Sequence, residues 1–125
     1  MANPNIVSVN SIFGNTTGFL LTTVLTNVLL ANATSSGKVF KIESIMVANV
    51  DGTNAADVSI DIHTAANGTA GTSFALAATI SVPADATLNL VDKNSTFYLM
   101  ENQSIIGGAS ANSVLEVVIA YEDIS

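Results

Sequence analysis

Residues 41–63 read KIESIMVANVDGTNAADVSIDIH and join two runs of different pattern. From Val58 to His63, apolar and polar side chains alternate strictly, which is typical of a half-buried strand. The preceding run, residues 39–50, is apolar on both faces and indicates a central strand covered on both sides. Asp51 and Gly52 lie between the runs, and this dipeptide favours a tight reversal of the chain. The stretch therefore predicts two strands joined by a turn.

The same pattern continues through the rest of the chain. Residues 74–82 (FALAATISV), 86–92 (ATLNLVD) and 113–125 (SVLEVVIAYEDIS) alternate in the same way, and Gly, Asn and Asp clusters separate them. Strand-length runs broken at regular intervals predict an all-β domain, an antiparallel sandwich or barrel. Residues 19–31 are ambiguous, because their leucines and valines also fall at helical spacing. Three threonines and two valines, with no Glu, Lys or Gln, favour strand there.

The composition indicates a piece of a larger assembly. The 125 residues fit one domain, and they are 49% hydrophobic but only 10% charged. So few charges leave apolar surface that other subunits are expected to cover. Residues 1–36 carry no charged side chain at all. We therefore divide the single domain into residues 1–34, an uncharged N-terminal arm with the first strands, and residues 35–125, the body of the sandwich.

The charge balance excludes several classes of partner. The net charge is −7, and Lys38, Lys41 and Lys93 are the only cations. Nucleic acids and anionic membranes need more positive charge than this. Residues 1–15 lack the features of a signal peptide, and the apolar run 18–33 is interrupted by Thr and Asn, so it is too short to span a bilayer. We expect a protein made in the cytoplasm, with no membrane partner.

The residues with potential chemistry favour structural interpretations. His63 is the only histidine and shares a strand face with Asp61, but no serine lies in a nucleophile-elbow motif. One histidine and no cysteine exclude the usual zinc sites. Residues 51–57 (DGTNAAD) offer loop oxygens but lack the EF-hand pattern, so a turn is favoured and a bound calcium ion stays open. We predict no enzyme, no catalytic residues, no cofactor and no metal.

Residues 35–62, SSGKVFKIESIMVANVDGTNAADVSIDI, resemble a recurring strand-and-turn pattern in small virion proteins of tailed bacteriophages. Residues 80–105 (ISVPADATLNLVDKNSTFYLMENQSI) and 115–125 (LEVVIAYEDIS) find counterparts in the same proteins, so the resemblance covers residues 35–125. It implies a single antiparallel β-sandwich, jelly-roll-like or immunoglobulin-like. It also implies a structural role, as a capsid decoration (cement) protein or as part of an appendage. The pattern holds no catalytic residues to carry over.

Composition and resemblance together predict a capsid decoration protein on the outer surface of a phage head. We expect a homo-oligomer, with a trimer favoured, that packs on the major capsid protein or other virion proteins. The apolar residues of the uncharged N-terminal segment are the predicted intersubunit contacts: Phe13, Phe19, Leu20 and Leu21. A tail-fibre or head-fibre component is the alternative, as is a carbohydrate-binding adhesion module that would use Tyr98 or Tyr121.

Overall fold

The computed structural model describes residues 4–5, 7–67 and 70–125. The described residues form strands, turns and loops, with no helix among them. In chain order, the strands are β1 (Ile12–Leu20), β2 (Asn27–Asn32), β3 (Val39–Asn49), β4 (Ala56–His63), β5 (Ser73–Val82), β6 (Thr87–Val91), β7 (Phe97–Leu99), β8 (Gln103–Ala109) and β9 (Leu115–Ile124). The helical alternative for residues 19–31 is wrong, and the strand interpretation holds at both ends of that segment. The strand interpretation did not predict that residues 21–26 form a connection between two strands.

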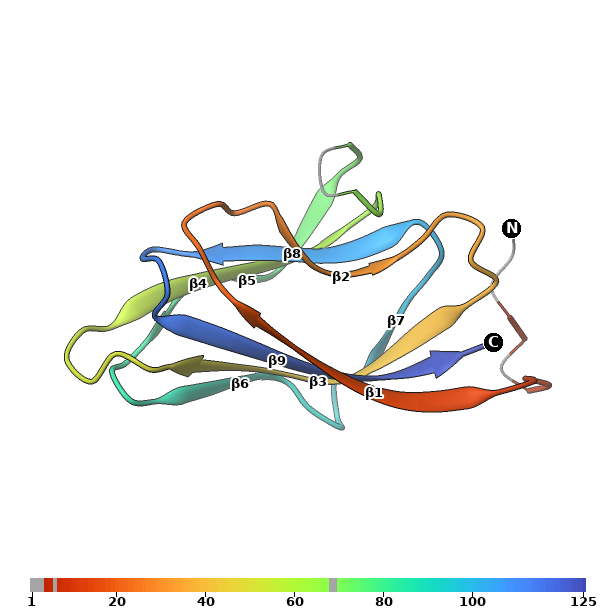
Figure 1. The fold of residues 1–125 in the computed structure, drawn as a ribbon, viewed down its shortest axis with the longest axis horizontal. Coiled ribbons are helices and arrows are strands. Elements are labelled where there is room, and N and C mark those ends of the chain that lie inside the picture. Colours follow the sequence, from red (N-terminus) through yellow and green to blue (C-terminus); the bar gives the residue numbers. More distant parts are fainter. Residues whose placement is uncertain (1–3, 6, 68–69) are drawn as a thin grey trace.

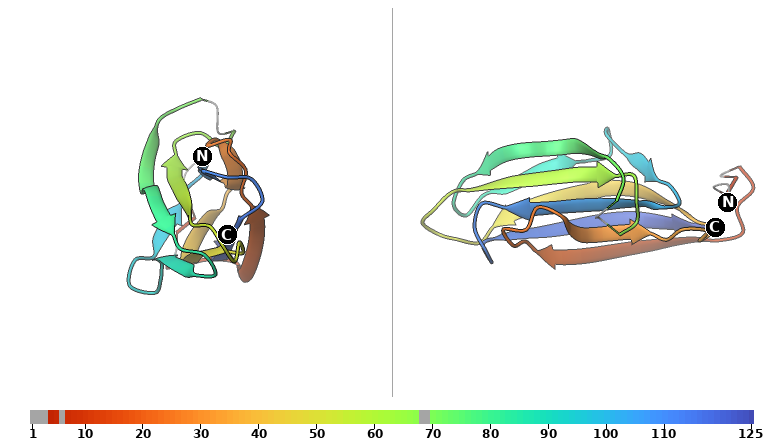
Figure 2. Two further views of the ribbon diagram at one scale, coloured as in Figure 1. Left: turned by 90° about the vertical axis from the view of Figure 1, so that its left-hand side faces the viewer. Right: turned by 90° about the horizontal axis from the view of Figure 1, so that it is seen from above.

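The strands form two antiparallel sheets that pack face to face (Figures 1 and 2). Sheet A has the order β1-β9-β3-β6, and β7 pairs with the other half of β3. Sheet B has the order β2-β8-β4-β5. The predicted antiparallel β-sandwich is confirmed.

The connectivity is that of a jelly roll, one of the two alternatives that the sequence left open. The chain crosses between the sheets at most connections, and β4–β5 and β6–β7 are the exceptions. Because β6 and β7 both pair with β3, they act as one interrupted strand. The result is eight strand positions in two four-stranded sheets, as in a jelly roll.

The core lies between the sheets. A β-bulge in β3 changes which of its side chains face this core, and the sequence pattern did not show it. The register of β3 with β9 shifts between Ile42 and Ser44. This β-bulge inserts one residue, so the side chains before and after it reach the same face. The β3 residues of the core cluster are Phe40, Ile42, Ile45 and Val47, whereas Met46 points outward and is exposed. The prediction that β3 is covered on both sides is therefore wrong along this part of the strand, which buries one face only. Asn49 is buried too, and Val39 is buried on the opposite face at the start of the strand.

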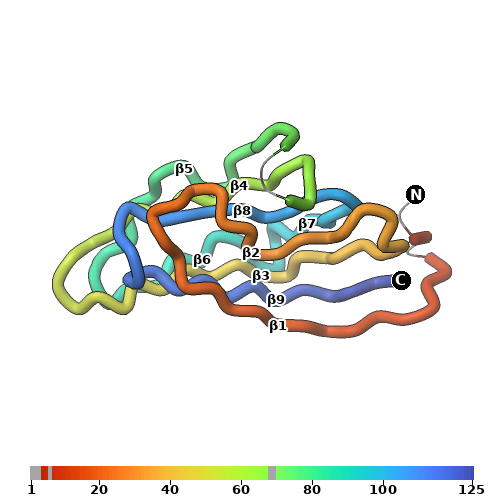
Figure 3. Tube along the Cα trace, turned by 45° about the horizontal axis from the view of Figure 1, so that its top comes forward, coloured from red at the N-terminus to blue at the C-terminus, as the bar shows by residue number. Residues whose placement is uncertain are grey.

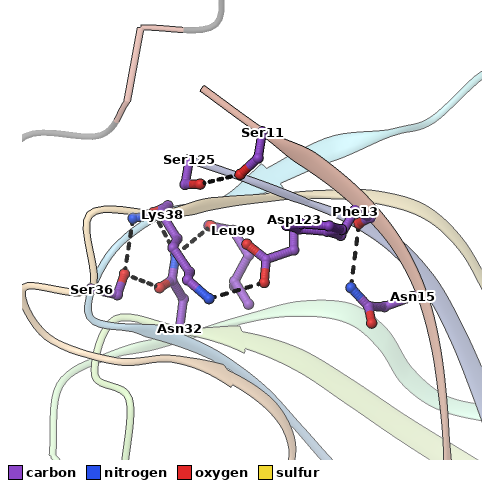
Figure 4. A network of polar contacts seen from close by, with 9 residues as sticks. All are labelled: Ser11, Phe13, Asn15, Asn32, Ser36, Lys38, Leu99, Asp123 and Ser125. Atoms are coloured by element: carbon purple, nitrogen blue, oxygen red, sulfur yellow. Dashed lines mark hydrogen bonds and ion pairs between the residues drawn. The ribbon is translucent and has the colours of Figure 1, made fainter. Parts of the chain in front are cut away.

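Polar contacts close the end of the sandwich at which β3 begins (Figure 4). Ser11 and Ser125 exchange backbone hydrogen bonds, and their side-chain oxygens lie 2.8 Å apart. Lys38, at the start of β3, forms an ion pair of 3.1 Å with Asp123 of β9. Together, these contacts hold the beginning of β1, the beginning of β3 and the end of β9 side by side.

Candidate interaction surface

His63 lies at the end of β4, on the outer face of sheet B. It was predicted on a polar strand face, yet only 5% of its surface is exposed. Its Nδ1 atom lies 2.8 Å from the Oγ atom of Ser73 in the neighbouring strand β5. Its Nε2 atom is buried and has no hydrogen-bond partner among the described residues. No carboxylate orients the ring, so His63 and Ser73 do not form the arrangement of a catalytic triad.

The connection that follows β4 covers this histidine. Ser104 of β8 is paired with His63 and donates a hydrogen bond of 2.7 Å from its Oγ atom to the carbonyl oxygen of Ala65. The backbone N–H of Ala66 donates to the side-chain oxygen of Asn102 at 3.3 Å. These bonds hold the connection against the outer face of β8. The burial of His63 follows from this cover.

The loop of residues 51–57 is a turn that its own side chain stabilises. The Oδ1 atom of Asp51 accepts hydrogen bonds from the backbone N–H groups of Thr53 and Asn54, at 2.8 and 3.2 Å. These two backbone bonds lower the pKa of the Asp51 carboxyl group. The carboxylate therefore binds its own backbone, as the turn interpretation predicts.

The described ranges hold neither a metal-binding cluster nor a membrane-spanning helix. Within them, no group of three or more His, Cys, Asp or Glu side chains is placed to hold a metal ion. The same ranges contain no apolar helix of membrane-spanning length.

The outer face of sheet B is largely covered by the chain itself along β8. Ser104 and Ile106 are buried although their side chains point away from the core, as the pairing with His63 and Asp61 shows. The β1–β2 connection passes over Gly108, where a Cβ atom would lie 2.5 Å from the carbonyl oxygen of Val24. Little of this face along β8 remains for a partner.

The outer face of sheet A is open around the middle of β9, whereas Val39 and Ile124 are buried on the same face where β3 begins. Ile12 and Tyr98 are exposed farther along the same face. Around the exposed Val118 of β9, the other exposed apolar side chains of this face are Leu20 on β1 and Met46 on β3, and the strand register places Val118 beside Met46. Small or uncharged residues surround them: Thr16, Gly18, Ala48, Thr87, Asn89 and Ala120. We call this set of residues the sheet A face. It is an apolar patch on a sheet, a feature that marks interaction surfaces, and Glu116 lies in its end row between Leu20 and Ala48.

Charged residues lie at the two ends of the sheet A face. Glu116 pairs with Leu20 at one end. At the other end, Lys41 lies opposite Glu122, and its Nζ atom is 3.4 Å from Oε1 of Glu43. A hydrogen bond with Glu43, burial and the negative charge of Glu43 raise the pKa of Glu122, and Lys41 opposes them. The protonated form of Glu122 is therefore favoured more than in an isolated glutamate.

The four predicted contact residues occupy different positions. Phe13 is 64% exposed at the start of β1, and Leu20 is 49% exposed on the sheet A face. Phe19 is partly buried and packs against the core cluster. Leu21 is fully buried in that cluster, so we do not carry it into the proposed interface.

The sequence analysis did not single out Met46 and Val118. Met46 looked like a core residue because the bulge at residues 42–44 is not visible in the pattern. The two tyrosines do not form a stacked pair. Tyr98 is opposite Lys41 on the outer side of sheet A, and Tyr121 packs inward against Phe40 with ring centroids 5.1 Å apart. This placement does not favour a sugar-binding platform on sheet A.

Comparison with known proteins shows similarity of fold alone. No protein-family model matches the chain, and no curated protein matches it. A subunit of the disulfide-linked pili of Bacillus endospore appendages is similar with a TM-score of 0.51 and 12% identity, over 92% of this chain and 87% of that one. This likeness shows a shared fold.

Two further similar structures come from virus particles. A chain of the Ralstonia phage GP4 capsid gives a TM-score of 0.44 and 8% identity, over 98% of this chain and 90% of that one. A chain of the icosahedral IBDV particle gives a TM-score of 0.48 and 12% identity, over 94% of this chain but only 31% of that one.

Proposed function

We propose that this chain is a structural subunit of a bacteriophage particle, acting as a capsid decoration protein. In this role, it packs on the outer surface of the capsid against the major capsid protein and stabilises the head by contact alone. The observation that carries the proposal is the sheet A face, where Leu20, Val118 and Met46 are exposed among mostly small, uncharged residues, with Glu116 in the end row. A face on which apolar and uncharged residues predominate suits the apolar core of a protein interface, from which charged residues are depleted.

The sequence resemblance to small virion proteins supports the same role. It covers residues 35–125, which include Met46 and Val118. The open face of sheet A and the covered strand β8 of sheet B give the molecule two different sides. A subunit that decorates a shell needs this asymmetry, because one side binds the shell and the other faces solvent.

The proposal is tested with capsids that lack this protein, mixed with the purified chain and sedimented. The wild-type chain should sediment with the capsids, and Val118→Glu should weaken binding because it places a charge in the apolar patch. Phe74→Ser is the control, since Phe74 is 60% exposed on β5 of sheet B, away from the sheet A face. Equal binding by both variants would remove the sheet A face from the proposal, and no binding by the wild type would remove the decoration role.

A subunit of an appendage, such as a tail or head fibre, is the second candidate. The observation that favours it is the fold shared with the Bacillus pilus subunit. This chain has no cysteine, so its copies have no disulfide to link them, and contacts between strands or faces would have to hold such a fibre together. Electron microscopy of the purified protein separates the two candidates: filaments that form without capsids support the fibre, and particles that remain small support decoration.

A further inference from the structure

The strands at the sheet edges differ in how far they could pair with another chain. An edge strand exposes unpaired backbone groups, and proteins usually blunt it with short length, bulges or charge. β2 has six residues and a shift of register, and β5 has two such shifts, with Thr79 at a φ of 47°. β6 and β7 have five and three residues, and a turn that contains Lys93 separates them. Three of the four edges are thus blunted.

The remaining edge, β1, has none of these features. Its nine residues pair with β9 without any shift of register, and they include no proline and no charged side chain. Figure 3 shows β1 beside β9, with no other strand along its free side. A long, regular and uncharged edge of this kind is a predicted site of strand pairing.

The backbone of β1 presents a regular row of donors and acceptors. Ser11 and Ser125 exchange both of their backbone hydrogen bonds. Because hydrogen-bonded residues alternate along an antiparallel pair, every second residue of β1 directs its N–H and C=O away from β9. These residues are Ile12, Gly14, Thr16, Gly18 and Leu20.

The sequence of β1 is nearly symmetric about its central residue. It reads IFGNTTGFL, with Thr16 in the middle. At equal distances from Thr16 lie two aliphatic residues, two phenylalanines, two glycines and two polar residues. These pairs are Ile12 and Leu20, Phe13 and Phe19, Gly14 and Gly18, and Asn15 and Thr17. A strand with this symmetry matches a second copy of itself running in the opposite direction.

We propose that two copies of this chain associate through antiparallel pairing of β1 with β1, on a two-fold axis at Thr16. The two A sheets then join into one continuous sheet. In this register, the outward-directed residues fall opposite each other and exchange both backbone hydrogen bonds. Phe13, 64% exposed in the single chain, lies opposite Phe19 of the partner subunit, and aromatic cross-strand pairs stabilise sheets.

The charge distribution permits this contact although the whole chain carries a net charge of −7. Residues 1–36 have no charged side chain, so the pairing places no like charges opposite each other. The contact has two-fold symmetry, which departs from the trimer that the sequence favoured. It does not depend on the proposed virion role, and its test uses the purified chain without capsids.

Cysteine cross-linking tests the position of the axis. The chain contains no cysteine, so Thr16→Cys introduces a single one. Paired residues in this register are about 5.5 Å apart between Cα atoms, within the reach of a disulfide. Mild oxidation should link Thr16→Cys into a dimer and leave Thr87→Cys monomeric. Thr87 is the control because it is also exposed, on the opposite edge strand of sheet A. Equal linking of the two variants overturns the proposal.

A mixture of two variants tests the register. Gly14 should face Gly18 of the partner subunit, and both positions have room for a side chain: a Cβ atom on Gly14 meets nothing within 4 Å, and one on Gly18 meets the Val117 carbonyl oxygen at 3.8 Å. Gly14→Cys and Gly18→Cys should therefore form a linked dimer more readily when mixed than either does alone. Equal yields from the mixture and the separate variants contradict this register.

Light scattering at several protein concentrations tests association in solution. The wild-type chain should show a dimer, and Thr16→Lys should weaken it about fivefold or more, because like charges then lie directly opposite each other. Thr87→Lys should leave it unchanged. Mixing Thr16→Lys with Thr16→Glu should restore the dimer, since opposite charges then meet on the axis. A wild-type chain that stays monomeric overturns the proposal. A Thr16→Lys variant that dimerises as well as the wild type overturns it too.

Discussion

The side-chain nitrogen of Asn32 lies 3.1 Å from the carbonyl oxygen of Leu99 and joins β2 of sheet B to β7 of sheet A. The same nitrogen donates to the carbonyl oxygen of Lys38 at 2.9 Å, and the side-chain oxygen accepts from the Ser36 hydroxyl (Figure 4). Asn49 also joins the two sheets. It belongs to β3 of sheet A, and its side-chain nitrogen donates to the carbonyl oxygen of Val82 of sheet B at 3.0 Å. Each buried amide thus joins the two sheets.

Asn32→Asp should destabilise the fold by about 3 kcal/mol, because it places an uncompensated charge in a buried site and removes both donors. The residue keeps its size, so the loss reports the added charge and the lost hydrogen bonds rather than a change in packing. Urea unfolding followed by circular dichroism measures the change. Asn89→Asp is the matched control, since Asn89 is exposed on β6, and it should change stability by less than about 0.5 kcal/mol. Similar losses in both variants would contradict the role given to Asn32.

Gly108→Ala should cost about 1–3 kcal/mol through overpacking. The added Cβ atom would lie 2.5 Å from the Val24 carbonyl oxygen and 2.9 Å from the Leu25 Cα atom. Both are backbone atoms, so the β1–β2 connection would have to move. Gly14→Ala is the control on an edge strand with free space around it, and its unfolding midpoint should stay within about 0.5 kcal/mol of the wild type. If Gly108→Ala is equally neutral, the connection does not pack as described.

The alternation of apolar and polar residues was sufficient to predict an all-β antiparallel domain, because it is local and period-two, and the resemblance to small virion proteins favoured the sandwich over the barrel. The alternation in β4 placed Val58 and Ile60 in the core correctly. It could not locate the bulge in β3, because an inserted residue depends on the pairing with β9 and leaves no mark in the β3 sequence. Met46 was therefore assigned to a covered strand although it is exposed.

The candidate surface was predictable only in part, because the exposure of a side chain depends on contacts between residues that are distant in sequence. The lack of charge in residues 1–36 pointed to an interaction role for β1, and Phe13 and Leu20 are indeed exposed in the single chain. Leu20 and Leu21 are adjacent and chemically identical, and only the fold separates their environments. The burial of His63 depends on the connection after β4, whose hydrogen bonds to β8 span up to 39 residues of sequence.

Leu21→Ala should lower the stability of the fold, whereas Leu20→Ala should weaken association. Leu21 is fully buried in the core cluster, so its truncation should cost about 2–5 kcal/mol of stability. Leu20 is 49% exposed, so its truncation should change the stability of the single chain by less than about 1 kcal/mol and should weaken association instead. Thermal unfolding at low concentration measures the first effect and light scattering the second. If Leu20→Ala lowers stability as much as Leu21→Ala, the placement of these neighbours on opposite sides of the sheet is wrong.

Glu122→Gln should stabilise the protein at neutral pH. The pKa of Glu122 is raised in the folded state, first by its hydrogen bond with Glu43, then by burial and by the charge of Glu43. The folded state therefore binds a proton more tightly than the unfolded state does. As pH rises from the ordinary pKa of a glutamate toward the raised value, stability falls, and the loss persists at higher pH.

A glutamine at this position is always neutral and removes that loss. Since Glu122 is partly exposed, we expect a gain of only about 0.5 kcal/mol at pH 7, with little difference from the wild type below about pH 4. Urea unfolding at several pH values measures both. Glu116→Gln, on the same strand and exposed, is the control and should show no such pH-dependent gain. A gain for Glu122→Gln that is the same at pH 3.5 and pH 7 would show that its cause is not the raised pKa of Glu122.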